Sequence, residues 1–380
     1  EMIGQVLQSR SEEFPQSRQV FKKITPITGK KGLVQLQGKN SAIARTKAFK
    51  LFRKPSMEHI GGHIRGVSEE LLQSIEEANG ELILDPSQID EIVLRVASKM
   101  FLGVDLKNLS GDVARDFYKL NRLCGERMLS PLSLPLFFPT VKNRKILKHR
   151  AKLRENFSRL MRSKRSEDQN TLLGVFSDDE NVLDHVLTFL FAGHDTTSSS
   201  ILFTLMLLSE RKDLQERISG GDDLLLQCAY KESLRLFPPA YMLAREARDH
   251  CELGRLRIKR GDLVIIPLVA LHRNPANFSE PDKFLPERFL AGQSSIDRFS
   301  YLPFGFSKKS CVGEKLANLE SSIVIKEILK RFELVEVERL QEIDSLVTLQ
   351  FPSQSYLKLK RKFSKKEVIN ANSKTKIIER

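Results

Sequence analysis

Residues 301–313 read YLPFGFSKKSCVG and form the most informative motif in the chain. Its turn-forming residues predict a polar loop, and apolar residues at helical spacing follow: Val312, Leu316, Leu319 and Ile323. Cys311 therefore stands at a predicted helix start, where free amide hydrogens and the helix dipole favour a thiolate. The positive charges of Lys308 and Lys309 also favour the thiolate form of Cys311. A stable thiolate is a soft metal ligand, although a lone cysteine is more often a small buried apolar residue.

A long, largely apolar segment at 181–210 predicts a helix buried through the centre of the domain. Gly193 leaves room beside this helix, and Thr196 and Thr197 can donate hydrogen bonds to carbonyls one turn earlier. Asp195 beside Thr196 supplies a carboxylate and a hydroxyl, the pair that relays protons into an apolar pocket. The alternative is an ordinary Ser/Thr cluster with a solvated Asp195.

Residues 224–236 predict a second helix, which the prolines at 238 and 239 end. Glu232 and Arg235 are three apart and share a helix face. The apolar residues around them predict burial, where a bidentate carboxylate to guanidinium pair is needed. The alternative is an exposed pair worth a few tenths of a kcal/mol.

Weaker patterns complete the secondary structure. Residues 144–168 predict an exposed amphipathic helix. Residues 255–258 and 263–267 predict short strands, joined by a turn at Gly261. Helix therefore dominates, with a small β part.

Composition and charge bound the class of protein. Hydrophobic residues make up 41% of the 380, which excludes a disordered chain and fits one large domain over 1–357. The net charge is +14, and residues 358–380 hold nine Lys or Arg against two Glu, so we expect a basic tail, disordered or surface-binding. No aromatic interleaving or nucleic-acid motif accompanies the charge, so no nucleic-acid partner is expected.

The four cysteines are widely spaced, which argues against a disulfide scaffold and favours a reducing compartment. No apolar run approaches the roughly 18 to 20 residues of a membrane span. The chain begins at Glu1, so an anchor could precede it. The expected location is cytoplasmic, or membrane-associated on the cytoplasmic side if such an anchor exists.

The loop around Cys311 resembles the cysteine-ligand loop of the cytochrome P450 family, through Phe304, Gly305, Cys311 and Gly313, with Ala317 and Glu320 beyond. Four further segments resemble that family in order and roughly in spacing: AGHDTT at 192–197, ESLR at 232–235, HRNP at 272–275 and FLPERF at 284–289. The resemblance is strongest from about 171 to 320. It implies a mainly α fold with a small β part, without the family's N-terminal strands.

This resemblance implies haem b (iron protoporphyrin IX) as cofactor, with the thiolate of Cys311 as the iron ligand and Phe304 and Gly193 in the haem site. Haem carries two propionates, which need cationic partners. By resemblance, Arg45 and Arg245 sit where the family places such partners. The alternative is that Arg45 is an ordinary surface arginine without a role in binding.

The resemblance also assigns roles away from the iron. Asp195 and Thr196 would relay protons for oxygen activation. Arg288 would join Glu232 and Arg235 in a structural network that holds the loop under the haem.

Three departures from the family pattern concern haem binding. Lys309 replaces the usual arginine and lacks its planar fork, so weaker propionate anchoring is expected. Ser307 replaces a glycine where a tight loop favours positive φ, which implies either strain or a shifted loop. Ser41 stands where the family commonly has Trp or His, and the chain has no Trp.

The implied activity is a haem-dependent monooxygenase that inserts one oxygen atom of O2 into a lipophilic substrate. Its electrons would come from an external flavoprotein reductase or ferredoxin, because no flavin or nicotinamide fingerprint is visible. Phe189, Phe191, Met242 and Leu243 are the expected apolar pocket walls. The alternatives are a haem-thiolate isomerase or peroxygenase, and a degenerate, non-catalytic binding protein of the same fold.

Overall fold

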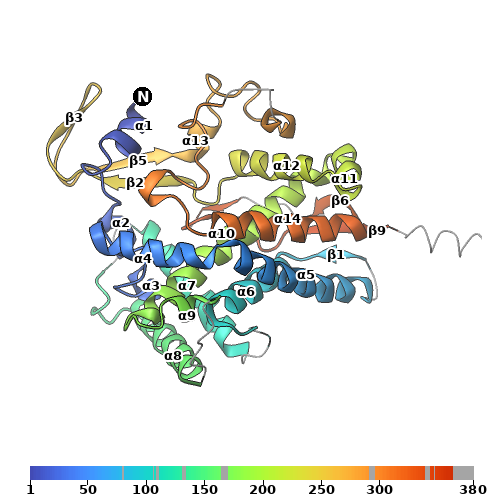
Figure 1. The fold of residues 1–380 in the computed structure, drawn as a ribbon, viewed down its shortest axis with the longest axis horizontal. Helices are drawn as coiled ribbons and strands as arrows, with labels where there is room; N and C mark the ends of the chain where they lie inside the picture. Colours follow the sequence, from blue (N-terminus) through green and yellow to red (C-terminus); the bar gives the residue numbers. More distant parts are fainter. Residues whose placement is uncertain are drawn as a thin grey trace, which may run out of the picture.

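The fold is mainly helical, with a few short antiparallel strands (Figure 1). The computed structural model describes residues 1–78, 81–105, 107, 111–130, 134–163, 170–290, 296–338, 343–345 and 347–362. The helices are α1 (Met2–Gly4), the π-helical turn η1 (Gln5–Ser9), α2 (Arg18–Lys22), α3 (Thr25–Thr28), α4 (Gly38–Leu51), α5 (Lys54–Glu76), α6 (Pro86–Leu102), α7 (Gly111–Leu129), α8 (Val141–Ser163), α9 (Leu172–Val175), α10 (Val182–Ser209), α11 (Lys212–Ser219), α12 (Asp223–Leu236), α13 (Leu268–His272) and α14 (Glu314–Arg331), with 3-10 turns η3 (Pro286–Phe289) and η4 (Ser307–Lys309).

The strands form small antiparallel sheets. Their bounds are β1 (Ile83–Leu84), β2 (Met242–Glu246), β3 (Cys251–Leu253), β4 (Leu256–Ile258), β5 (Leu263–Pro267), β6 (Phe332–Glu338), β7 (Asp344–Ser345), β8 (Leu349–Gln350) and β9 (Tyr356–Arg361). The pairings are β1-β9-β6, β2-β5, β3-β4 and β7-β8. The predicted strands at 255–258 and 263–267 correspond to β4 and β5, but these strands pair with β3 and β2 and not with each other.

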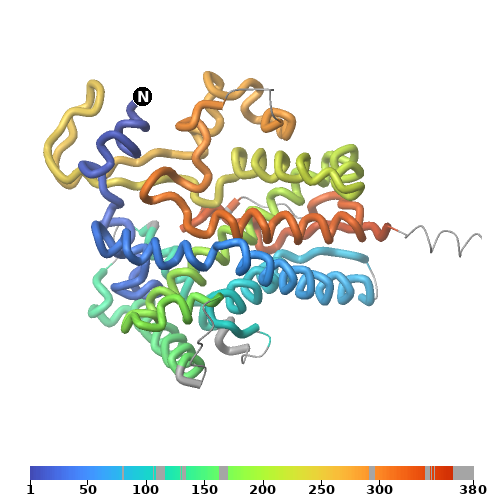
Figure 2. Tube along the Cα trace, viewed as in Figure 1, coloured from blue at the N-terminus to red at the C-terminus, as the bar shows by residue number. Residues whose placement is uncertain are grey.

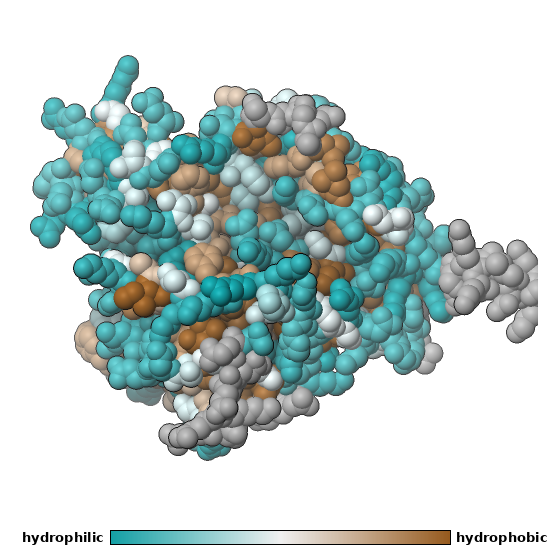
Figure 3. Space-filling view, viewed as in Figure 1, coloured by the Kyte–Doolittle hydropathy of each residue, from teal (hydrophilic) through white to brown (hydrophobic). Residues whose placement is uncertain are grey.

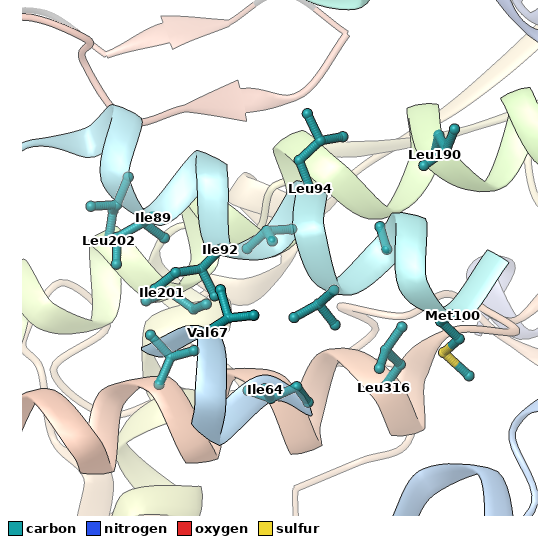
Figure 4. Packing of buried hydrophobic residues seen from close by; sticks show 14 of the residues in the cluster. Ile64, Val67, Ile89, Ile92, Leu94, Met100, Leu190, Ile201, Leu202 and Leu316 are labelled. Atoms are coloured by element: carbon teal, nitrogen blue, oxygen red, sulfur yellow. The ribbon is translucent and has the colours of Figure 1, made fainter. Parts of the chain in front are cut away.

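Helix α10 is the axis of the molecule, as its apolar pattern predicted. Its buried Ile201 and Leu202 pack with Ile89 and Ile92 of α6 (Figure 4). Ile64 and Val67 of α5 and Leu316 of α14 lie on the other side of this layer. A helix that is apolar around most of its circumference gains most when other helices surround it, which explains its central place.

Local signals account for several helix ends. Asp85 and Gln88 form a capping box at the start of α6, and Gly103 ends that helix in the left-handed conformation, at φ 74°. Asp222 caps α12 by accepting a hydrogen bond from the amide of Leu225. The predicted helices at 181–210 and 224–236 are confirmed to within one residue. The predicted helix at 144–168 begins earlier, at Val141, and its last residues fall outside the described chain.

The amino-terminal segment packs against the strands that precede the cysteine loop. Figure 2 shows this segment, in blue, beside the yellow strands β2 and β5. Gln16 forms an isolated antiparallel bridge with Arg245, and the amide of Glu246 donates to the carbonyl of Pro15 at 3.0 Å. The amino-terminal segment and strand β2 therefore lie side by side, although they are more than 200 residues apart in sequence.

The predicted boundary of the basic tail at 358 is wrong, because residues 358–361 belong to strand β9. Lys358 contacts Glu338 of β6 at 2.6 Å, and the amide of Lys362 donates to the carbonyl of Arg331 at 2.7 Å. Residues 363–380 lie outside the described chain. The face in Figure 3 is largely hydrophilic, with apolar side chains set between the polar ones. Within the described residues, no helix has the length and apolar character to cross a bilayer.

Candidate active site

A cavity of about 380 Å³ lies between α10 and the cysteine loop. One wall is the middle of α10, where Gly193 and Thr196 face it. The opposite wall holds Cys311, and apolar residues such as Leu33 and Phe101 close the sides. The middle of α10 and Cys311, which are more than 100 residues apart in sequence, therefore line one cavity.

Cys311 borders this cavity, so its accessible surface faces the cavity. Its amide donates to the carbonyl of Phe304 at 2.7 Å, which closes the loop. Burial raises the pKa of the Cys311 thiol, and the negative charge of Glu314 adds to the rise. The amides of Gly313 and Glu314 and the Arg45 guanidinium lower that pKa in part. The predicted helix start is displaced, since α14 begins at Glu314. The cation that lowers the pKa of Cys311 is Arg45, and not Lys308 or Lys309 as the sequence predicted.

The loop before Cys311 contains two residues in the left-handed region. Gly305 has φ 72° and Ser307 has φ 58°. Glycine adopts this conformation freely, whereas a residue with a Cβ is strained there by about 1–2 kcal/mol. The strain that the sequence implied at Ser307 is present.

Three cations face the same cavity as Cys311. Arg45 donates to the carbonyl of Ser310, and Arg245 donates to that of Ala244 at 3.1 Å. Lys309 donates to the carbonyl of Leu36 at 3.3 Å and to the hydroxyl oxygen of Ser41 at 2.8 Å. Among the described residues, no carboxylate lies within salt-bridge distance of these three groups.

Burial without a counter-charge lowers the pKa of all three cations. It lowers the pKa of Arg45 and of Arg245, and the nearby Cys311 partly offsets the effect on Arg45. The pKa of Lys309 falls to about 8, because of burial and then because of Arg45 and Arg245. Cations gathered in this way favour an anionic ligand in the cavity.

Comparison with known proteins agrees with this geometry. The family model described as Cytochrome P450 matches residues 1–220 and 224–359. The chain belongs to the cytochrome P450 family. Its relatives include the cyclooctat-9-en-7-ol 5-monooxygenase of Streptomyces melanosporofaciens, 29% identical over 64% of this chain and 60% of that one. Cytochrome P450 4c3 of Drosophila melanogaster is 34% identical over 49% of this chain and 39% of that one.

The fold also matches solved P450 structures. A cytochrome P450DA haem domain superimposes with a TM-score of 0.83 at 20% identity, over 96% of this chain and 87% of that one. The chain spans 60% and 39% of the lengths of the two curated relatives. The mainly α fold with a small β part is thus confirmed.

Membership in the P450 family implies a haem with cysteine thiolate ligation, and the cavity suits one. The sulfur of Cys311 is a donor of the required type. The three uncompensated cations match a ligand with two carboxylates. A Cβ added at Gly193 would come within 4 Å of only one side chain, Phe101, at 3.9 Å, so this part of α10 leaves open space opposite the sulfur. Phe304 and Gly193 both line the cavity, as the resemblance implied.

Of the two predicted proton-relay residues of this P450, only Thr196 lines the cavity. Its hydroxyl donates to the carbonyl of Ala192 at 2.7 Å, the bond to the preceding turn that the sequence predicted. Asp195 is absent from the cavity wall. Its carboxylate accepts hydrogen bonds from Asn121 at 2.5 Å and from Gln350 at 2.8 Å.

Asp195 also contacts the imidazole of the preceding residue. The Nδ1 atom of His194 lies 2.6 Å from Oδ1 of Asp195, and its Nε2 atom lies 4.0 Å from Oδ1 of Asp90. Burial lowers the pKa of His194, but the two carboxylates outweigh it and raise that pKa overall. No sequence signal pointed to Asn121, Gln350 or Asp90, because they come from separate elements.

Glu232, Arg235 and Arg288 form the predicted network, away from the cavity. Arg235 donates to both carboxylate oxygens of Glu232, at 2.7 and 2.9 Å, and Arg288 donates to one of them at 2.9 Å. Arg235 also donates to the carbonyls of His272, Pro281 and Lys283. The exposed-pair alternative is wrong, since Glu232 and Arg235 are fully buried.

Three of the four residues that were expected to form the apolar walls line the cavity. Phe189, Met242 and Leu243 line the cavity, while Phe191 packs against the core instead. Residues two apart on an α-helix point about 200° apart, so Phe189 and Phe191 cannot share one face.

Proposed function

We propose that this chain is a haem-thiolate monooxygenase that transfers one oxygen atom of O2 to a lipophilic substrate, with electrons from an external donor protein. The observation that carries the proposal is the shared cavity of Cys311 and three buried cations that lack carboxylate partners. A haem held there would supply the activation of O2 and the oxygen transfer.

The residues of the chain would hold that group from two sides. Cys311 would bind the iron, with its charge stabilised by the amides of Gly313 and Glu314. Arg45, Arg245 and Lys309 would bind the two propionates. Lys309 is a point donor already engaged with Ser41, so Arg45 and Arg245 would contribute more to anchoring.

The walls of the cavity favour an apolar substrate. Leu33, Val34 and Phe101 line it together with Phe189 of α10. Polar substrates would lose hydration there without gaining enough partners. The Streptomyces relative is named for oxygenation of cyclooctat-9-en-7-ol, which suits a substrate of this class.

Asp195 and Thr196 would move protons toward the cavity. A hydroxyl that passes on a proton accepts one at its oxygen and releases its own, so the bond from Thr196 to the carbonyl of Ala192 must open during transfer. Asp195 lies behind it, held by Asn121 and Gln350. Its other oxygen contacts His194, so the carboxylate must leave the amides or the imidazole before it can serve Thr196.

Reduced-carbonyl difference spectroscopy on the reconstituted chain tests the proposal. The wild type should take up haem and give the Soret shift of a thiolate-ligated iron. Cys311→Ser should lose that shift, and Cys251→Ser, which replaces a free cysteine outside the cavity, should keep it. Absence of haem uptake by the wild type would refute the proposal and favour a non-catalytic binding protein.

The proton relay has its own test. Thr196→Ala and Asp195→Asn should each divert electrons from product to peroxide, because protons then arrive too slowly. Thr204→Ala is the matched control, since Thr204 makes the same backward bond, to Ser200 at 2.7 Å, but lies outside the cavity. If both variants deliver the same fraction of electrons to product as the wild type, the proposed proton relay is refuted.

A further inference from the structure

His194 is a buried imidazole in the middle of α10 that the proposed reaction does not yet use. Its side chain is 1% exposed. The rings of Phe117 and Tyr118 on α7 meet it edge to face, with centroids 5.8 and 5.1 Å away. An imidazole packed in this way has little freedom to turn, so its two nitrogens keep their directions.

The two nitrogens face carboxylates on two different helices. Nδ1 lies 2.6 Å from Oδ1 of Asp195, and Nε2 lies 4.0 Å from Oδ1 of Asp90 on α6. Nε2 is buried and makes no hydrogen bond with a described residue. Burial lowers the pKa of His194, but the two carboxylates outweigh it and raise that pKa overall. His194 therefore keeps its positive charge to a higher pH than an ordinary histidine.

The groups that face His194 come from α6, α7 and α10. Among the described residues, His194 is the only cation within salt-bridge distance of Asp90 or Asp195. Tyr118 also faces the imidazole, but burial and the nearby carboxylates raise the pKa of its hydroxyl, which stays uncharged. The Asp90 side chain is 32% exposed; burial raises its pKa, and the charge of His194 lowers it in part. The proton on His194 therefore sets whether Asp195 contacts a cation or a neutral ring.

We propose that His194 is a positioning residue for Asp195: its charged imidazole holds the carboxylate away from Thr196, and loss of its proton releases the carboxylate. The amides of Asn121 and Gln350 bind the other oxygen at any pH, because they do not titrate. A charge-assisted hydrogen bond is roughly twice as strong as a neutral one, so a neutral His194 holds Asp195 less tightly. This inference rests on the proposed proton relay, in which Asp195 serves Thr196.

The fate of electrons in the haem-loaded chain tests the effect on the relay. NADPH, a ferredoxin and its reductase supply the electrons, and the fraction recovered as hydrogen peroxide is measured without added substrate. His194→Asn keeps a neutral donor close to Asp195 and removes the charge. Near pH 6 it should release up to about five-fold less peroxide than the wild type, because Asp195 reaches Thr196 more often. The two proteins should converge near pH 9, where the wild-type imidazole loses its proton.

Histidine NMR tests the positioning itself and needs no haem. The full chain has seven histidines, and the resonance absent from His194→Asn identifies His194. Its titration midpoint should lie above pH 6.5. Asp90→Asn should lower that midpoint by about one pH unit or more, because an opposite charge 4.0 Å away is lost. Glu91→Gln, the matched control on α6, faces Arg95 and should leave the midpoint unchanged.

The two measurements separate this inference from the proposed function. A chain that takes up no haem would refute the proposed function, whereas the NMR titration would be unaffected. A midpoint at or below pH 6.5, or one that Asp90→Asn does not move, would overturn the positioning role even if haem binds. More peroxide from His194→Asn than from the wild type near pH 6 would also overturn it, since His194 would then assist proton delivery. Circular dichroism melting checks that each variant is folded.

Discussion

Replacing Glu232 with Gln should destabilise the chain more than any exposed charge change. The Glu232 carboxylate accepts four hydrogen bonds: two from Arg235, one from Arg288 at 2.9 Å and one from the amide of Leu285 at 3.0 Å. Glutamine removes the negative charge and turns one acceptor into a donor that faces other donors. Arg235, fully buried, then keeps its hydrogen bonds to backbone carbonyls but loses the negative charge that compensates its own.

The magnitude follows from that arrangement. Breaking a buried ion pair by removing one partner costs about 3–5 kcal/mol, because a buried charge is left uncompensated. Whole domains have about 5–15 kcal/mol of stability, so the change removes a large share of it. Urea unfolding, followed by circular dichroism on the full chain, measures the difference directly.

A matched pair gives the control. Glu327 and Lys330 have the same i,i+3 spacing on α14, at 2.7 Å, but the Lys330 side chain is 45% exposed. Glu327→Gln should cost less than about 1 kcal/mol. A cost for Glu232→Gln no greater than that of Glu327→Gln would refute the reasoning.

Three further outcomes are expected from urea unfolding. His272 accepts a hydrogen bond from the amide of Leu302 at Nε2, and burial lowers its pKa to about 4, so the unfolded chain binds more protons below pH 6.5. Wild-type stability should fall by about 2 kcal/mol between pH 7.5 and 5.0 for this reason, and His272→Gln should remove that part of the slope. Ser307→Gly should stabilise by about 0.5–1 kcal/mol because it relieves positive φ, and equal stability would contradict the strain at Ser307. Gly32→Ala should destabilise by about 3 kcal/mol, because its Cβ would lie 2.0 Å from Oγ1 of Thr188, whereas Gly62→Ala, open and helical, should stabilise by up to about 1 kcal/mol.

Much of the fold was predictable because its signals are local. The extent of α10 follows from an uninterrupted apolar pattern, and the end of α12 follows from two prolines. Glu232 and Arg235 could be predicted to pair because both lie on one face of one helix. Arg288 could be added only through the family resemblance, since 53 residues separate it from Arg235.

The orientation of Asp195 was not predictable. The residue follows the cavity-facing Gly193 by two positions on a helix, and its partners Asn121 and Gln350 lie 74 and 155 residues away in sequence. Similarly, no pattern indicated that Ser41 would accept a hydrogen bond from Lys309. Contacts of this kind depend on how separate helices and strands pack, and packing leaves no periodic trace in sequence.

Local sequence patterns specify which elements form and which loop carries the reactive sulfur, because helix periodicity, turn residues and caps act over a few neighbouring positions. Only the tertiary structure decided which charges meet around that sulfur and which carboxylate is turned away from it. Arg45 acts on Cys311 from α4, far away in sequence, and long-range packing alone sets the distance on which this electrostatic effect depends.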